Sequence, residues 1–289
     1  MVIELKRLCP FDPEHLPNEI LLIETLQQRF PKLQQIACFD TAFHHNMPLV
    51  AQMLAIPRRY QEKGLRRYGF HGLSYNFLMQ ELTRIADEKI ANGRIVLAHL
   101  GSGASLAAVH RGQSVDTSMG FTPNSGVTMS TRTGDIEPGL STYLMQSENL
   151  THQQFNQLVN FESGLLGISE TSSDIRDLLD KQKSDHRAAE AIALFCYQIK
   201  KQIGAYAAAL GGLDALVFSG GIGENSAEVR SKICDGLEFL GIDINVTNNR
   251  ENTLIISNAS ANVVVYVIPT DEEQMMASMM LEVLNLSNE

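Results

Sequence analysis

Two glycine-bearing turns are the stretches of this chain best suited to bind a ligand. The first, Gly101-Ser102-Gly103-Ala104-Ser105, separates the apolar runs Ile95–Ala98 and Leu106–Val109, and this pattern predicts a β-hairpin. Glycine lets a ligand come close to the backbone amides, as phosphate oxygens do. A tight structural hairpin explains the pattern equally well, and the strand–loop–strand order fits neither a dinucleotide-binding loop nor a Walker loop.

The second turn, Ser219–Ser226, follows the apolar run Ala215–Phe218. It precedes a segment with Val229, Ile233 and Leu237 at helical spacing. Strand, glycine loop and helix in this order direct backbone amides and a helix dipole toward an anion or the phosphates of a nucleotide. One such turn is weak evidence, but two in one chain indicate a nucleotide-binding cleft.

Three side chains have the chemistry that such a cleft needs. Asp40 follows the apolar run Ile36–Phe39, where α/β proteins hold a metal or catalytic group, although a helix N-cap explains this position more often. His71 lies between two glycines in an irregular loop, where side chains often point at ligands, although a single histidine is more often structural. Arg132 stands among hydroxyls and carboxylates and can clamp a phosphoryl group or form a surface ion pair.

Composition limits the class of protein. The 289 residues predict about two domains. The net charge of −10, from 23 basic and 33 acidic residues, argues against binding to nucleic acid or to an anionic membrane. The sequence contains no apolar run long enough to span a membrane and no signal-peptide pattern, so we expect a cytoplasmic protein. The scattered cysteines predict buried, unpaired thiols: Cys9, Cys38, Cys196 and Cys234.

Periodicity and breakers predict the elements. Prolines predict that most of 1–17 is an irregular lead-in, and apolar spacing predicts helices over 18–30, 75–89 and 187–210. Apolar runs predict strands at 36–39, 215–218 and 263–268, with a Met-rich helix closing the chain. Ser173 is the predicted N-cap of a short helix. The alternation of strands and helices predicts an α/β fold with mixed sheets.

Several motifs, taken in order and spacing, resemble the acetate kinase family of the actin-like superfamily. They are CFDTAFH (38–44), RRYGFHG (66–72), HLGSGASLAAV (99–109), SVDTSMGFTP (114–123), TRTGDIEP (131–138), SGLLGIS (163–169), IGAYAAALGGLDALVFSGGIGENSAEVR (203–230) and VIPTDEE (267–273). The resemblance implies an actin-like, ribonuclease H-like α/β fold with flanking helices. Its domains would be 1–43, a remnant of the first domain, 44–273, a nucleotide-binding second domain, and 274–289, a helix returning to the first.

The resemblance also implies an activity: reversible phosphoryl transfer between ATP and acetate that gives acetyl phosphate, with Mg²⁺, in a homodimer. By resemblance, His71 would stabilise the in-line transition state and Arg132 would bind the transferring phosphoryl group. Asp40 and Glu272 would organise Mg²⁺ and its waters. These residue types suit the reaction, because phosphoryl transfer depends on positioning and charge neutralisation more than on covalent chemistry.

The same resemblance implies binding residues for the nucleotide and the acyl group. The nucleotide would be held by the backbone of His99, Leu100, Gly101, Ser102, Gly103, Asp174, Ile175, Arg176, Gly221, Ile222, Gly223, Glu224 and Asn225. Phe70 and Pro123 would line a small acyl pocket. Propionate and butyrate stay open as substrates, because one methylene discriminates by only about 1–3 kcal/mol.

The chain departs from the family pattern at several positions. Leu73, Tyr75, Ser102, Ser130 and Asp271 stand where the family has Thr, His, Asn, Gly and Asn. The family's N-terminal phosphate hairpin has no counterpart, so we expect the chain to lack the N-terminal part of the first domain and to turn over slowly or not at all by itself. Two other functions stay open: a non-catalytic nucleotide-binding remnant and a dimerising interaction protein.

Overall fold

The computed structural model describes residues 1–9 and 16–284. The chain divides into two compact units, one of Met1–Phe39 with Met276–Glu289 and one of Asp40–Met275. The second unit contains every residue that the sequence assigned to chemistry, and its elements are therefore the ones that position the site.

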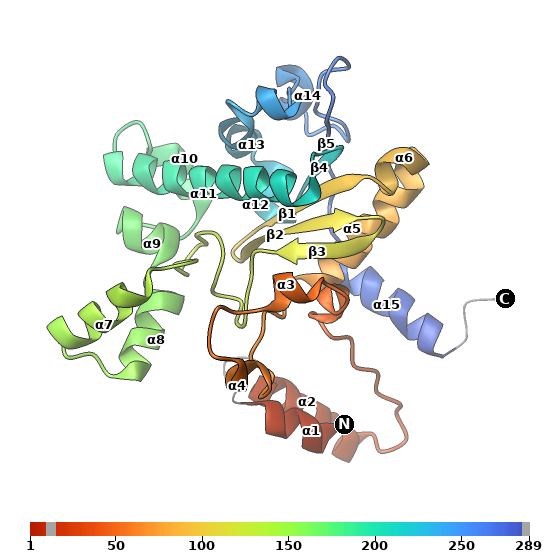
Figure 1. Ribbon diagram of the computed structural model, residues 1–289, viewed down its shortest axis with the longest axis vertical. Coiled ribbons are helices and arrows are strands. Elements are labelled where there is room, and N and C mark those ends of the chain that lie inside the picture. Colours follow the sequence, from red (N-terminus) through yellow and green to blue (C-terminus); the bar gives the residue numbers. More distant parts are fainter. Residues whose placement is uncertain (10–15, 285–289) are drawn as a thin grey trace. The chain divides into compact units, whose positions relative to one another are not determined.

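A five-stranded mixed sheet carries the core of the second unit (Figure 1). Its strands are β1 (Arg94–Leu100), β2 (Ala104–His110), β3 (Gln113–Thr117), β4 (Ala215–Ser219) and β5 (Val264–Val267). The order is β3-β2-β1-β4-β5; β1 and β3 run antiparallel to β2, whereas β4 runs parallel to both β1 and β5. The predicted α/β fold with a mixed sheet is confirmed, as are the hairpin and the strands near 215–218 and 263–268.

Helices cover both faces of this sheet. The long helix α11 (His186–Leu210) runs across one face (Figure 1), where Val96, Ala98 and Leu100 of β1 join the same buried cluster as Phe195 of α11. Alternate residues of β1 point to the opposite face, which α5 (Gly72–Ile85) covers. Because both faces are buried, polar side chains on the α5 side need partners inside the protein.

The predicted helix over 187–210 is confirmed, and its apolar stripe is core packing. All five stripe residues are buried: Ile192, Phe195, Ile199, Ile203 and Tyr206. Gly211 ends the helix in the left-handed conformation, with φ 71°, and its N–H donates to the carbonyls of the last turn.

The remaining helices of the second unit are mostly short. They are η2 (Ala42–His44), α3 (Leu49–Gln52), α4 (Arg58–Gln61), α6 (Glu88–Ala91), α7 (Pro138–Ser147), α8 (His152–Phe161), α9 (Gly164–Ser169), α10 (Ile175–Lys181), α12 (Gly220–Asn225), α13 (Ala227–Cys234), η3 (Glu238–Leu240) and α14 (Val246–Arg250). The first unit contains α1 (Val2–Leu8) and α2 (Leu16–Arg29), and α15 (Glu272–Val283) begins in the second unit and ends in the first.

The first unit corrects two predictions. Residues 36–39 form no strand, because an extended segment needs a neighbouring strand and the described residues of this unit offer only helices and irregular chain. The described part of the lead-in is mostly helical and not mostly irregular, since Val2–Leu8 forms α1 ahead of the first proline, with Leu5 buried. Residues 10–15 of the lead-in lie outside the described residues.

The second unit corrects several boundaries. The helix predicted over 75–89 is two helices, α5 and α6, and α5 begins three residues early, at Gly72. The glycine turn over 219–226 is itself mostly helical, as α12. Asp174, not Ser173, caps α10, because its carboxylate accepts from the Arg176 amide. The sequence did not predict β3, α7, α8 or α9.

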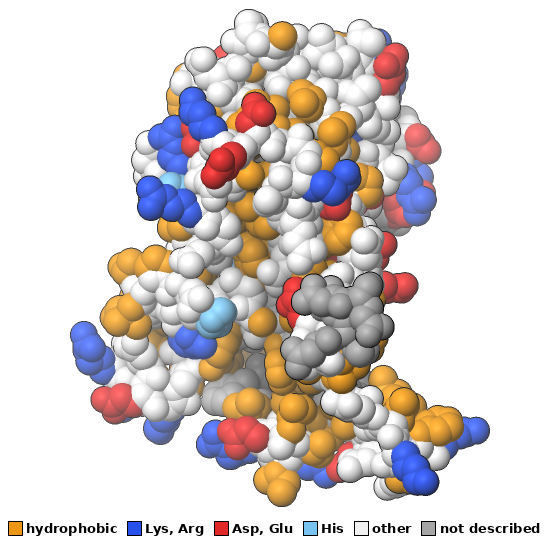
Figure 2. Space-filling model, turned by 90° about the vertical axis from the view of Figure 1, so that its right-hand side faces the viewer, with side chains coloured by type: hydrophobic (Ala, Val, Ile, Leu, Met, Phe, Trp, Pro, Cys, Tyr) orange, Lys and Arg blue, Asp and Glu red, His pale blue; other side chains and the backbone are white. Residues whose placement is uncertain are grey.

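The chain's surface and thiols agree in part with expectation. The four cysteines are unpaired; Cys196 and Cys234 are buried, whereas Cys9 and Cys38 are half-buried. Acidic and basic side chains are interspersed on the face shown in Figure 2. Among the helices of residues 1–9 and 16–284, the structure shows none long and apolar enough to cross a membrane.

Candidate active site

The loop before α5 holds His71 in a specific, strained conformation. Its backbone is left-handed, with φ 58°, which is uncommon outside glycine. The His71 N–H donates to Asp40 Oδ2 at 2.6 Å, and the Leu73 N–H donates to Asp40 Oδ1 at 3.3 Å. A β-carbon on Gly72 would lie 2.0 Å from the Asp40 carbonyl oxygen, so this close approach requires glycine. Asp40 therefore does cap a helix, but one that begins 32 residues further along the chain, at Gly72.

The His71 ring is fixed on two sides. Its Nδ1 lies 2.8 Å from Ser105 Oγ, and the ring stacks on His99 with centroids 4.2 Å apart. Burial lowers the pKa of His71 to about 4, and the positive charge of Arg132 adds to that effect. The imidazole is consequently neutral at pH 7, and its Nε2 lies on the side of Gly103.

His99 is held in the same way. Its Nδ1 lies 2.8 Å from Ser74 Oγ, which lies 2.8 Å from Thr270 Oγ1. These contacts join β1, α5 and the segment after β5. Burial lowers the pKa of His99 to about 3, and repulsion from His71, once that ring is protonated, lowers it further. His99 therefore supports the His71 ring as a neutral stacking partner.

Arg132 brings an unneutralised positive charge to the site. Its Nη1 donates to the Pro123 carbonyl at 2.9 Å and contacts the sulfur of Met129, and the ion pairs seen among the described residues do not include it. Burial lowers the pKa of Arg132, but the ordinary pKa of arginine is so high that the group stays charged at pH 7. The surface ion pair considered for Arg132 is not formed, and its charge is available for an anion.

His71 and Arg132 converge on Gly103. A β-carbon built on Gly103 would lie 3.3 Å from His71 Nε2 and 3.7 Å from Arg132 Nη1. The hairpin turn thus leaves an opening between a neutral imidazole and a cation. A negatively charged group in that opening would contact both side chains.

Two carboxylates, Asp40 and Glu272, interact electrostatically with each other. Burial raises the pKa of Glu272, and the negative charge of Asp40 raises it further, so the two groups repel each other electrostatically. Within the described ranges no group of three or more His, Cys, Asp or Glu side chains could hold a metal ion. Mg²⁺ is often bound by only one or two carboxylates together with water and phosphate. The pair of oxygen donors therefore fits Mg²⁺ and not a metal that needs a full protein cage.

A separate cavity of about 590 Å³ opens beside the hairpin turn. It is lined by Gly101, Ser102, Ser130, Ser173, Asp174, Ile175, Arg176, Leu179, Gly221, Ile222, Asn225 and Ser226. The three stretches predicted to hold the nucleotide meet here. Of their residues, His99, Leu100, Gly103, Gly223 and Glu224 are not in the lining, and Ser130, Ser173, Leu179 and Ser226 line it without having been predicted.

Glu224 and Arg230 bond the backbone of α12, whose residues line one wall of this cavity. Glu224 Oε1 accepts from the Gly220 amide at 2.8 Å and from the Thr270 amide at 3.1 Å, so the first amide of α12 is already occupied. Arg230 is fully buried and donates to the carbonyls of Gly223 and Glu224 at 2.7 and 2.9 Å. Sequence reasoning missed Arg230, because the pattern alone gives no sign that a helical arginine points inward.

The contacts of Phe70 and Pro123, which the resemblance assigns to the acyl pocket, and of Tyr75, which departs from the family pattern, complete the site. Phe70 is half-buried and packs against the core, and Pro123 contributes the carbonyl that orients Arg132. The Phe70 carbonyl accepts from Nε2 of the buried His44 at 3.1 Å, a histidine that the sequence did not single out. Tyr75 is fully buried and its hydroxyl bonds Ser105 Oγ.

Comparison with known proteins identifies the family of this chain. The model of the Acetokinase family matches residues 1–278. The acetate kinase of Rhodopseudomonas palustris is 44% identical over 279 residues, which are 96% of this chain and 70% of the relative. A propionate kinase of Escherichia fergusonii is also 44% identical, over 96% of this chain and 69% of its own length.

A solved structure is similar over the same range. The crystal structure of Porphyromonas gingivalis acetate kinase superposes with a TM-score of 0.91 at 39% identity, covering 98% of this chain and 72% of that one. Sequence family, relatives and fold all agree with the resemblance drawn from the motifs. The chain belongs to the Acetokinase family, phosphotransferases that use ATP and act on small molecules.

Proposed function

We propose that the second unit transfers the γ-phosphoryl group of ATP reversibly to acetate, with His71, Arg132 and Asp40 as the catalytic residues. One observation carries this proposal: His71 Nε2 and Arg132 Nη1 flank the same opening at Gly103. The transition state of phosphoryl transfer spreads negative charge over the equatorial oxygens of the transferring group. A fixed cation and a fixed N–H donor on either side of that group would stabilise this charge without reorganising.

The surroundings of the two side chains support these roles. Arg132 is oriented by a carbonyl and by sulfur, neither of which neutralises its charge. His71 is held by the Asp40 carboxylate through its backbone and by Ser105 through its ring. Both groups are thus positioned before a substrate arrives, which lowers the cost of reaching the reactive geometry.

We propose that the nucleotide occupies the cavity lined by Gly101, Asp174 and Gly221, next to that opening. Its volume of about 590 Å³ is typical of small-molecule sites. Asp40 and Glu272 would hold Mg²⁺ through water, and the ion would supply charge neutralisation to the phosphates. The carboxylate repulsion seen in the raised pKa of Glu272 supports this assignment, because a cation there would relieve it.

Acetate is the proposed acceptor, and propionate is the second candidate. The Pro123 carbonyl accepts from Arg132, and the half-buried phenyl ring of Phe70 suits a short alkyl group. A relative named propionate kinase, at 44% identity, is the reason to keep propionate as a candidate. The ratio of kcat/KM for acetate, propionate and butyrate distinguishes these acceptors.

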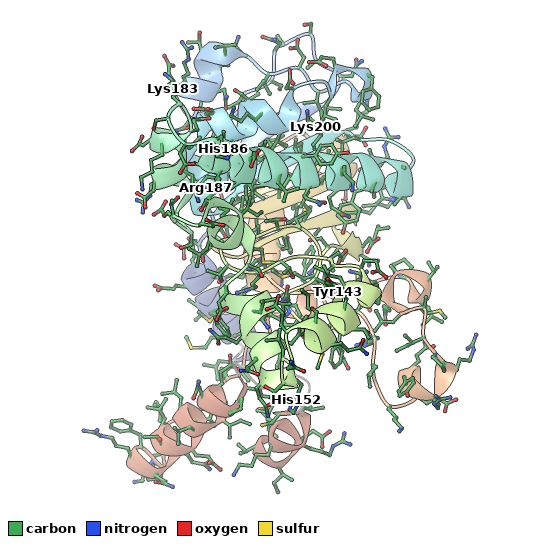
Figure 3. All side chains as sticks on the ribbon, turned by 90° about the vertical axis from the view of Figure 1, so that its left-hand side faces the viewer. Tyr143, His152, Lys183, His186, Arg187 and Lys200 are labelled. Atoms are coloured by element: carbon green, nitrogen blue, oxygen red, sulfur yellow. The ribbon has the colours of Figure 1, made fainter. Side chains whose placement is uncertain are left out.

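We also propose a homodimer in the cytoplasm. Exposed aromatic side chains support association: Tyr143 on α7 is 66% exposed and Tyr197 on α11 is 57% exposed. Figure 3 shows Tyr143 on α7 and the basic residues His186, Arg187 and Lys200 on α11. Four unpaired thiols are compatible with a reducing compartment. Light scattering coupled to size-exclusion chromatography measures the assembly directly.

Titration calorimetry with ATP, with and without Mg²⁺, combined with a radiolabelled acetyl phosphate assay, tests the proposed function. A labelled assay is needed because the departures from the family pattern predict a low rate. We expect Mg²⁺-dependent ATP binding and acetate-dependent product, with product lost in Arg132→Ala while ATP binding persists. Binding without product in the wild type would leave a nucleotide-binding protein, and no binding would leave the interaction protein.

A further inference from the structure

Tyr75 lies at the end of a buried hydrogen-bonded chain that leads to His71. Its hydroxyl bonds Ser105 Oγ, and Ser105 Oγ lies 2.8 Å from His71 Nδ1. Tyr75 and Ser105 are both 0% exposed, so bulk water does not reach their hydroxyl groups. The direction of the protons along this chain therefore depends on the protein groups alone.

The partners of the Tyr75 hydroxyl decide that direction. Among the described residues, Ser105 is its one hydrogen-bond partner. A buried O–H that donates to nothing is costly, so the Tyr75 proton must point at Ser105 Oγ. The Ser105 proton must then point at its remaining partner, His71 Nδ1. A ring that accepts at Nδ1 and is neutral carries its own proton on Nε2.

The opposite direction satisfies fewer groups. If His71 Nδ1 donated to Ser105 and Ser105 donated to Tyr75, the Tyr75 hydroxyl would be a buried donor without an acceptor.

His44 adopts the same Nε2–H tautomer through its own, separate contacts. Its Nε2 faces the Phe70 carbonyl at 3.1 Å and must donate there, so its Nδ1 accepts from Ser114 Oγ at 2.8 Å.

We propose that Tyr75, acting through Ser105, positions His71 as the Nε2–H tautomer, with that N–H directed at the opening beside Gly103 and Arg132. The catalytic importance of this arrangement rests on the proposed function; the tautomer itself does not. The other end of the imidazole then presents a donor to the negatively charged group that Arg132 also contacts. Tyr75 is in this sense a positioning residue and touches no substrate.

Nitrogen-15 NMR of the histidine rings in the whole chain reads the tautomer without any turnover. The signals of His71 are assigned by their loss in His71→Gln. We expect wild-type His71 at pH 7 with a protonated Nε2 and a hydrogen-bonded, unprotonated Nδ1. In Tyr75→Phe the Nδ1 signal should shift toward the position of a nitrogen with a weaker hydrogen bond.

Kinetics then test whether Tyr75 acts through Ser105. We expect Tyr75→Phe to lower kcat about three- to tenfold and Ser105→Ala to lower it more, both with the KM for ATP unchanged. The Tyr75→Phe loss should vanish in a Ser105→Ala background, because the chain is already broken there. Tyr206→Phe is the matched control: Tyr206 is a buried tyrosine of α11 and is not part of the hydrogen-bonded chain from Tyr75 to His71.

Three results would overturn the proposal. A wild-type His71 protonated on Nδ1 reverses the inferred direction. Additive losses in Tyr75→Phe and Ser105→Ala make Tyr75 independent of Ser105, and an unchanged Nδ1 signal in Tyr75→Phe removes its influence altogether. If Tyr75→Phe does not fold, the wild-type spectrum alone still decides the tautomer. If the chain phosphorylates no acid, the proposed function fails while the spectrum still reads the positioning of His71.

Discussion

Gly103→Ala places one methyl group in the opening between His71 and Arg132. The new β-carbon would lie 3.3 Å from His71 Nε2, 3.4 Å from His71 Cε1 and 3.7 Å from Arg132 Nη1. The imidazole cannot easily move away, because Ser105 holds Nδ1 at 2.8 Å and His99 stacks on the ring. The methyl group therefore occupies the space in which, by the proposed function, the transferring phosphoryl group contacts both side chains.

The expected effects on folding and on catalysis differ in size. The φ of Gly103 is not positive, and the nearest contacts need to yield by only a few tenths of an ångström. The free energy of unfolding should therefore change by no more than about 1 kcal/mol. Displacing reacting groups by about 1 Å can cost about 100-fold in rate, so kcat should fall by about that factor.

Single-turnover phosphoryl transfer and ATP calorimetry separate these effects. ATP binding should stay within about threefold of wild type, since Gly103 is not among the residues that line the cavity. Gly204→Ala, in α11 with nothing within 4 Å of the added carbon, controls for the substitution itself and should raise stability by about 0.5–1 kcal/mol. An unchanged kcat in Gly103→Ala, or a rate loss matched by unfolding, would refute the reasoning.

Three further predictions use the same geometry. Arg132→Ala should lower kcat about 1,000-fold, as loss of a phosphoryl-binding arginine does. The melting temperature should stay nearly unchanged, because the guanidinium contacts a carbonyl and a sulfur among the described residues. Single-turnover rates and calorimetric melting check this prediction, and a large drop in stability would contradict it. Gly72→Ala should lower the free energy of unfolding by about 3 kcal/mol, because its β-carbon would lie 2.0 Å from the Asp40 carbonyl oxygen. Urea titrations measure this change, and a stable variant would mean that the loop rearranges freely. The histidines His44, His71 and His99 have folded pKa values of about 4, 4 and 3, below the ordinary 6.5, so the unfolded chain binds more protons as pH falls. The free energy of unfolding should accordingly be highest above pH 6.5 and decline toward pH 4. His71→Gln should reduce the slope of the free energy of unfolding against pH by up to about 1.4 kcal/mol per pH unit, measured in the same titrations. An unchanged slope would show that His71 titrates normally.

The sequence alone predicted the elements whose signals are local. The apolar runs of β1, β2, β4 and β5 and the stripe of α11 follow from burial on a sheet face or one helix face, which period and composition reveal. The order and spacing of the motifs also indicated the family before any coordinate was known, because each motif is a local stretch of sequence.

Local pattern failed where a neighbour decided the outcome. The run 36–39 has the composition of a strand but no strand beside it, and β3 is a strand because β2 offers it an edge. Asp40 had two competing explanations from sequence. In the structure it caps α5 and also lies near Glu272, because one carboxylate has room for several partners.

The site itself is a product of tertiary structure. His71 and Arg132 are separated by 61 positions in the sequence, and only the hairpin turn at Gly103 shows that they share one opening. The left-handed backbone of His71 and the buried contact between Tyr75 and Ser105 depend on how α5 packs on the sheet. Residue types determine which chemistry is available to this chain, whereas packing determines which atoms meet, because distances between elements are set by the whole core and not by any single segment.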